Sequence, residues 1–207
     1  MTQHATITRE TTTRPVPPPP AHDRTVPERP SALERMLWTH DGWGPLLLRL
    51  TLGVVFFAHG AQKVFGWFGG AGPGATVEQF AGMGLPGVLA VFVMAAELGG
   101  AILLILGALT RLGALAILGV MVGAIATVHA QFGFFMNWSG AKAGEGFEYH
   151  LLAIGICLGL LASGGGRWSV DRVLARKREE QRARDRARVE PVPPLTSTRE
   201  DTLTRRG

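Results

Sequence analysis

Cysteine is almost absent from this chain, and its scarcity limits the redox chemistry that the side chains can perform. Cys157 is the only cysteine among the 207 residues. One cysteine cannot form an intramolecular disulfide, and no C-x-x-C pair exists for thiol exchange. Any redox role must therefore use a cofactor or a partner. We interpret Cys157 itself as a small apolar residue in a helix core.

Motifs for binding metals and nucleic acids are also lacking. No apolar segment holds H-x-x-H or E-x-x-H in its middle, so a metal site would lack the ligand spacing usual in helical bundles. The net charge of +5 comes from residues 167–207, where twelve Lys/Arg outnumber seven Asp/Glu. This basic run directly follows an apolar segment and carries no nucleic-acid recognition motif. We therefore expect it to contact anionic lipid headgroups, and we predict neither a metal site nor a nucleic-acid partner.

Four long apolar stretches occupy the middle of the chain. They cover residues 46–68, 86–109, 112–135 and 147–164. A helix needs about 20 apolar residues to cross a bilayer, so the first three are long enough and the fourth lies at the lower limit. The sequence thus predicts an all-α protein, a four-helix transmembrane bundle surrounded by lipid.

The connections between these stretches differ in basic residues. Residues 69–85 contain no Lys or Arg, and residues 136–146 contain only Lys142, whereas Arg111 lies in the second connection. By the positive-inside rule, both termini are cytoplasmic. The predicted regions are a disordered Pro/Thr-rich cytoplasmic arm, a four-span membrane domain and a basic cytoplasmic tail, over residues 1–45, 46–166 and 167–207.

Short helices are predicted outside the spans, at residues 31–40, 76–83 and 169–188. Ser31 and Glu34 have the spacing of a capping box, and so do Thr76 and Gln79. Within the first span, Arg49 is close enough to the cytoplasmic end to extend its charge to the membrane surface.

Small residues recur at every fourth position in the last two spans. These stripes consist of Gly119, Gly123 and Thr127, and of Gly155, Gly159 and Ser163. Small residues at this spacing let helices approach closely in a membrane, so we expect both stripes to face neighbouring helices.

Ionisable and polar residues lie inside the apolar stretches or at their edges. Such groups are costly in a membrane and by default face a protein interior. At 1.5 Å per residue, His59 and Glu97 both lie about 15 Å from the outer ends of their spans, so we expect a shared pocket in the outer half of the bundle. We also expect His59 or Lys63 to pair with Glu97. The candidate pocket residues are His59, Gln62, Lys63, Glu97, His129, Glu148 and His150.

These residues leave several functions open. Histidine and glutamate can relay protons to a quinone. Histidines on facing helices can also ligate a haem, but the spacing of the histidines in this chain favours a haem less than a quinone. The leading hypothesis is a redox-associated, quinone-facing subunit. The alternatives are a small proton- or cation-coupled transporter and a non-catalytic assembly subunit, in which the polar residues only fix helix register. The pattern leaves open whether the chain is an enzyme and whether it forms homo-oligomers or joins other membrane or redox subunits.

Several motifs in a fixed order resemble the DoxX family of bacterial membrane proteins. After Arg49, residues 56–66 read FFAHGAQKVFG, and ELGG follows at residues 97–100. Further similarity lies at residues 84–86, 107–111, 129–135 and 165–171, so the resemblance covers about residues 46–172. The positions that match the family pattern are Arg49, His59, Gly60, Lys63, Glu97, Arg111, His129 and Glu148.

The resemblance implies a four-helix protein of the bacterial inner membrane. Some members of the family are linked to quinone-coupled sulfur oxidation or to membrane complexes that handle oxidative stress. The family also contains many members without a defined activity, so the resemblance implies the fold more strongly than the function.

Overall fold

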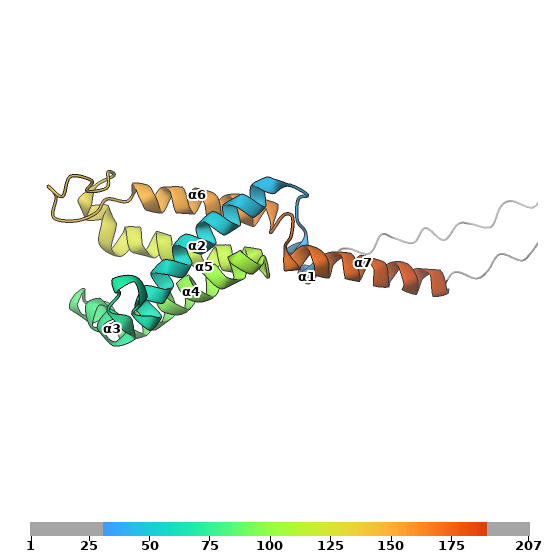
Figure 1. Cartoon of the computed structure of the whole chain (residues 1–207), viewed down its shortest axis with the longest axis horizontal. Helices are drawn as coiled ribbons and strands as arrows, with labels where there is room; N and C mark the ends of the chain where they lie inside the picture. The colour runs from blue at the N-terminus through green and yellow to red at the C-terminus, as the bar shows by residue number, and fades with distance from the viewer. Residues whose placement is uncertain (1–30, 190–207) are drawn as a thin grey trace, which may run out of the picture. The chain divides into compact units, whose positions relative to one another are not determined.

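A computed structural model describes residues 31–189, which form helices joined by short loops and contain no β-strand. Residues 1–30 of the predicted disordered arm and the end of the predicted tail, residues 190–207, lie outside this range. The helices, in chain order, are α1 (Ala32–Leu37), α2 (Trp43–Phe65), η1 (Trp67–Gly69), α3 (Gly72–Gly82), α4 (Gly87–Leu106), α5 (Thr110–Ala124), η2 (Ile125–His129), η3 (Ala130–Phe132), α6 (Glu148–Ser163) and α7 (Val170–Val189) (Figure 1). The rest of the predicted arm, residues 31–45, contains helix α1 and the first turn of helix α2 and is therefore ordered.

Three helical segments of the described range are long and apolar enough to cross a membrane. They are α2, α4 and the continuous segment Thr110–Phe132, which joins α5 to η2 and η3. Helix α6 is apolar but has only 16 residues. Helix α2 begins at Trp43, three residues before the predicted start, and ends where Gly66 adopts a left-handed conformation with φ 70°. A glycine tolerates this conformation and therefore ends the helix.

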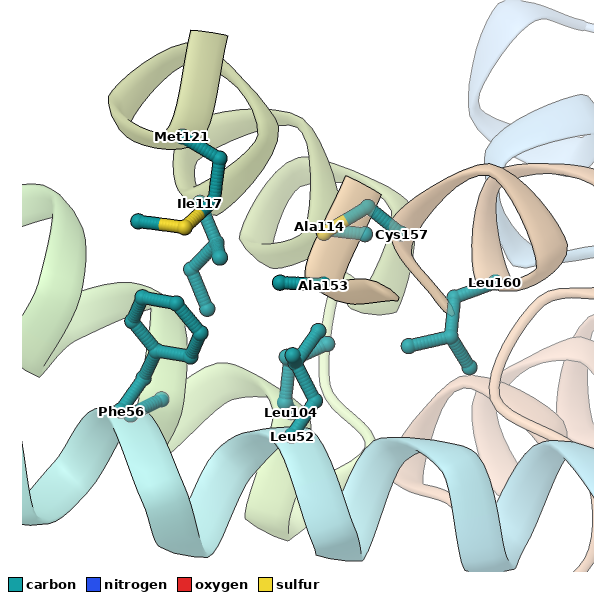
Figure 2. Packing of buried hydrophobic residues seen from close by; sticks show 10 residues of the cluster. Leu52, Phe56, Leu104, Ala114, Ile117, Met121, Ala153, Cys157 and Leu160 are labelled. Atoms are coloured by element: carbon teal, nitrogen blue, oxygen red, sulfur yellow. The ribbon is translucent and has the colours of Figure 1, made fainter. Parts of the chain in front are cut away.

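Four helices enclose one apolar core. Helix α2 contacts α4, α4 contacts α5, α5 contacts α6, and α6 returns to α2. Figure 2 shows Leu52 and Phe56 of α2 packed near Leu104, Ile117 and other core residues. Cys157 is fully buried in this core, which confirms its interpretation as a small apolar residue.

Glycines let α4 pack closely against α2 and α5. The predicted stripe of small residues on α5 does not take part in this packing. A Cβ atom at Gly60 would lie 2.7 Å from the backbone nitrogen of Leu98, and one at Gly113 would lie 3.0 Å from the carbonyl oxygen of Gly100. By contrast, Cβ atoms at Gly119 and Gly123 would meet nothing within 4 Å. The prediction that this stripe packs against a helix is therefore wrong, because periodicity does not reveal whether another helix lies against the glycines.

Arg49 is buried, and its predicted extension to the membrane surface is wrong. Its side chain is 2% exposed. The guanidinium donates hydrogen bonds to backbone carbonyls, including those of Leu104 and Ile105 at 2.9 and 2.6 Å. The last carbonyls of a helix have no partner within the helix, so Arg49 satisfies the end of α4. Its other three acceptors lie in the loop between α6 and α7, namely Gly165, Arg167 and Trp168.

Asp171 and Arg111 complete the links at this end of the helices, which we call the Arg49 end. The Asp171 carboxylate accepts hydrogen bonds from the backbone N–H groups of Leu109 and Thr110, at 2.6 and 2.9 Å, where α5 begins. Arg111 donates to the carbonyls of Leu161 and Ala162 at the end of α6. Side chains from other elements therefore satisfy the backbone ends of three helices.

The shorter helices follow the predictions in part. The capping box of Ser31 and Glu34 is confirmed at the start of α1. Helix α3 exists but begins at Gly72, so Thr76 lies inside it and donates to the carbonyl of Gly72 rather than capping. The predicted charged helix after the fourth span is confirmed as α7.

Candidate functional site

A cavity of about 710 Å³ lies between the helices at the end opposite Arg49, where α2 ends and α4 begins. We call this the cavity end. Residues of α2, α3, α4, α5, η2 and α6 form its wall, and most of them are apolar. The volume falls within the range of about 300–1,000 Å³ that is usual for small-molecule sites.

The structure brings five of the seven predicted pocket residues to the cavity wall. These are His59, Lys63, Glu97, His129 and His150. Two others point elsewhere. Gln62 donates to the carbonyl of Phe68 at 3.2 Å, and the Glu148 carboxylate accepts from the backbone of Met136 and the indole of Trp138, both at 3.0 Å. Glu148 thus fixes the loop before α6.

Lys63 and Glu97 form an ion pair across α2 and α4. Lys63 Nζ lies 2.5 Å from Glu97 Oε2, and the side chains are 26% and 6% exposed. A buried carboxylate without a partner is very costly, and a close cation offsets much of this cost. The structure therefore selects Lys63 rather than His59 as the partner of Glu97. His59 lies one helical turn before Lys63 and remains available to the cavity.

Two histidines meet on the other side of the cavity. The rings of His129 and His150 have centroids 4.1 Å apart and are tilted by 41°. His129 Nδ1 donates to the carbonyl of Glu145 at 2.9 Å. His150 is 7% exposed, and its Nδ1 has no hydrogen-bond partner among the described residues. His129 is presented by η2, a single π-helical turn, and such turns often occur at functional sites.

Tyr149 is a wall residue that the sequence interpretation missed. Its ring centroid lies 6.4 Å from that of His59, and its buried hydroxyl has no hydrogen-bond partner within residues 31–189. Buried tyrosine hydroxyls usually find a partner. The sequence feature that could have identified it as a wall residue is its position, because this only tyrosine of the chain directly precedes the predicted pocket residue His150.

The histidine pair does not fit the two axial positions of a haem. Within residues 31–189, no group of three or more His, Cys, Asp or Glu side chains is arranged to hold a metal ion. Two imidazoles on opposite sides of a metal must leave room for two bonds of about 2 Å each. The rings of His129 and His150 are too close for that arrangement.

The comparisons with known proteins identify the family. A family model described as DoxX matches residues 44–130. "Putative oxidoreductase CatD" of Bacillus subtilis (strain 168) is 35% identical over 58% of this chain and 80% of its own length. "Uncharacterized membrane protein Rv3486" of Mycobacterium tuberculosis (strain ATCC 25618 / H37Rv) is 36% identical over 69% and 88%. This chain belongs to the DoxX family.

A third DoxX relative, "Inner membrane protein YqjF" of Escherichia coli (strain K12), is 30% identical over 65% of this chain and 94% of its own length. No solved structure matches the chain. Together with the three apolar helices, the family establishes a membrane protein. The range matched by the DoxX model includes His59, Lys63, Glu97 and His129, whereas α6 lies beyond it.

Proposed function

We propose that this DoxX protein binds a quinone headgroup in its cavity, as a redox-associated subunit of a membrane oxidoreductase or an oxidative-stress complex. The observation that carries the proposal is the pair of unsatisfied buried groups on the wall, the Tyr149 hydroxyl and His150 Nδ1. A buried polar group without a partner costs about 1–3 kcal/mol, and a ligand that supplies the partner recovers this energy.

The chemistry of the wall suits a quinone. Such a headgroup is a flat ring with two carbonyl oxygens, which accept hydrogen bonds and take up protons when the ring is reduced. Tyr149 can donate through its hydroxyl and His150 through Nδ1, while the apolar wall surrounds the ring. His129 lies against His150 and supplies a second imidazole through which a proton can pass. A relative named as an oxidoreductase agrees with a redox role.

The proposal includes a four-helix transmembrane bundle in the bacterial inner membrane, with both termini cytoplasmic and the cavity in the outer half. The scarcity of basic residues at 69–85 and 136–146 supports this orientation. Reporter fusions after Gly74 and Gly144 should read as extracytoplasmic, and fusions after Arg111 as cytoplasmic. A cytoplasmic signal at Gly74 would overturn the orientation.

Quinone titration of the purified protein tests the function. We expect saturable binding of a short-chain quinone, which Tyr149→Phe weakens about 3- to 10-fold, the effect of one lost hydrogen bond. The matched control is Gln62→Leu, which removes a polar group that does not line the cavity. Folded protein that binds no quinone, or equal effects of the two variants, would contradict the proposal.

The Lys63–Glu97 pair favours a second candidate, a small proton- or cation-coupled transporter. A buried carboxylate beside a cavity can exchange its lysine partner for a proton or a cation. This function predicts proton-coupled flux in liposomes that Glu97→Gln abolishes. Folded protein with neither quinone binding nor flux would instead indicate a non-catalytic assembly subunit.

A further inference from the structure

Helices α4 and α5 are in close contact near the Arg49 end. Gly100 and Gly113 lie there with their backbones so near that a Cβ atom at Gly113 would be 3.0 Å from the Gly100 carbonyl oxygen. One at Gly100 would be 3.2 Å from Ile117. The contact leaves no space for a ligand between the two helices at this level.

Toward the cavity end, α5 carries small residues where it borders the cavity. Gly119 and Gly123 of α5 both line the cavity, and a Cβ atom at either would meet nothing within 4 Å. Ala96 and Val93 of α4 form the wall on the other side. The missing side chains at Gly119 and Gly123 leave space at the α4–α5 side of the cavity that larger side chains would fill, and we call this space the passage.

Apolar residues at this passage belong both to the cavity wall and to the outer surface of the protein. Phe92 of α4 is 74% exposed, and Leu115 of α5 is 55% exposed. Both lie on helices that are apolar and long enough to cross a membrane, where an exposed face contacts lipid tails. The cavity is therefore bordered by lipid between α4 and α5.

The unsatisfied polar groups are on a different helix. His150, which is 93% buried, and Tyr149 are contributed by α6, whereas the passage lies between α4 and α5. A ligand with a polar head and an apolar tail can place its head against α6 and its tail in the passage. A small water-soluble molecule would leave the apolar passage without a role.

We propose that α4 and α5 form a lateral opening through which the hydrocarbon tail of a lipid-soluble quinone leaves the cavity. This inference rests on the proposed quinone site and adds that the ligand is a membrane lipid, entering from the bilayer. The opening is bordered by Phe92 and Leu115, and Gly119 and Gly123 give the tail its space.

Leucine at the two glycines tests the opening without removing any polar group. We would prepare Gly119→Leu and Gly123→Leu in lipid nanodiscs, with Gly155→Leu of α6 as the matched control. Gly155 also has nothing within 4 Å of its Cβ position, but it does not belong to the cavity wall. All three changes add the same volume to a helix, so thermal unfolding should report similar stabilities.

Binding would be measured with ubiquinone and menaquinone headgroups, each with and without an isoprenoid tail. For the headgroup that the unchanged protein binds, we expect Gly119→Leu and Gly123→Leu to weaken the tailed form at least about tenfold and the tailless form less than about twofold. Gly155→Leu should change neither.

Two results would overturn the opening while leaving the quinone site in place. One is a tailed quinone that binds all variants equally, and the other is equal weakening of tailed and tailless forms. If the unchanged protein binds no quinone in any form, the proposed function itself fails, and the opening fails with it.

Discussion

The two ends of the four-helix core differ in how their buried polar groups are paired, although the Lys63–Glu97 ion pair at the cavity end is satisfied. At the Arg49 end, Arg49 donates to carbonyls at the end of α4, and Asp171 accepts from N–H groups at the start of α5. At the cavity end, the Tyr149 hydroxyl and His150 Nδ1 have no partner within the described residues. Thr110 Oγ1 is an exception at the Arg49 end, because it too is buried without a partner.

This difference separates residues that maintain the fold from residues that can act on a ligand. A satisfied polar network holds the helix ends in one arrangement. An unsatisfied buried group lowers stability, and such costs are typical of functional sites. Several positions of the DoxX pattern, including Arg49 and Arg111, therefore have a structural role, whereas His59, Lys63, Glu97 and His129 line the cavity.

The largest effect is expected for Arg49→Met, which keeps an unbranched side chain but removes five hydrogen bonds to carbonyls. Each buried carbonyl left without a partner costs about 1–3 kcal/mol. The free energy of unfolding should fall by at least about 3 kcal/mol, measured by thermal or denaturant unfolding in detergent. Arg176→Met, on the exposed surface of α7, is the control and should have little effect. Equal stability of the two variants would show that the Arg49 end is not held by this network.

A smaller loss is expected for Glu97→Gln, because Lys63 is partly exposed and can reach water. We expect a decrease in stability of about 1–3 kcal/mol, since the partly buried lysine loses its counter-charge. Adding Lys63→Met should restore stability, because neither charge of the pair is then left without its partner. Unfolding and binding of the two single variants and the double variant measure this coupling. Simply additive effects would mean that the two residues do not act together.

Tyr149→Phe should not lower the stability of the ligand-free protein, and should raise it by up to about 1–3 kcal/mol, while weakening quinone binding. The removed hydroxyl has no partner among residues 31–189, so its loss breaks no interaction there. Thermal unfolding and quinone titration of the same preparation test this contrast with Arg49→Met. A large destabilisation would reveal a structural role for the hydroxyl and weaken the distinction between the two ends.

The smallest effect concerns pH at the Arg49 end. A hydrogen bond from Arg172, aided by the charges of Arg172 and Arg167, lowers the pKa of Asp41 to about 2. Because the pKa is lowered in the folded protein, the stabilisation is present above the ordinary value of 3.8 and is lost as pH falls through about 2. Asp41→Asn should therefore be slightly less stable than the unchanged protein above pH 4 and should become equal to it below about pH 2. A difference that persists at the lowest pH would contradict the pairing.

Apolar length and helix signals predicted much of the fold. The spans and the capping box at Ser31 follow from local sequence, so the helices appear close to their expected positions. The helix ends differ from the predicted ends of the spans by a few residues. In α2, for example, Gly66 ends the helix before the predicted end at residue 68. The structural role of Arg49 was not predictable, because its acceptors lie more than 50 residues away in the chain.

The candidate site was predicted less completely. Ionisable residues in apolar segments identified five residues of the wall, since their burial is costly anywhere else. The prediction was wrong for Gln62 and Glu148, because hydrogen bonds to nearby backbone groups hold their side chains away from the cavity. Tyr149 was missed because a tyrosine at the edge of a span usually marks the membrane interface.

Photolabelling with an azido-substituted quinone tests the central claim, that the cavity holds a quinone headgroup against α6. We predict that fragmentation in the mass spectrometer will place the label on Tyr149 or His150 itself, and that excess unlabelled quinone will remove it. Label on lipid-facing residues such as Leu152, which is 70% exposed, and unchanged by the competitor, would contradict the account.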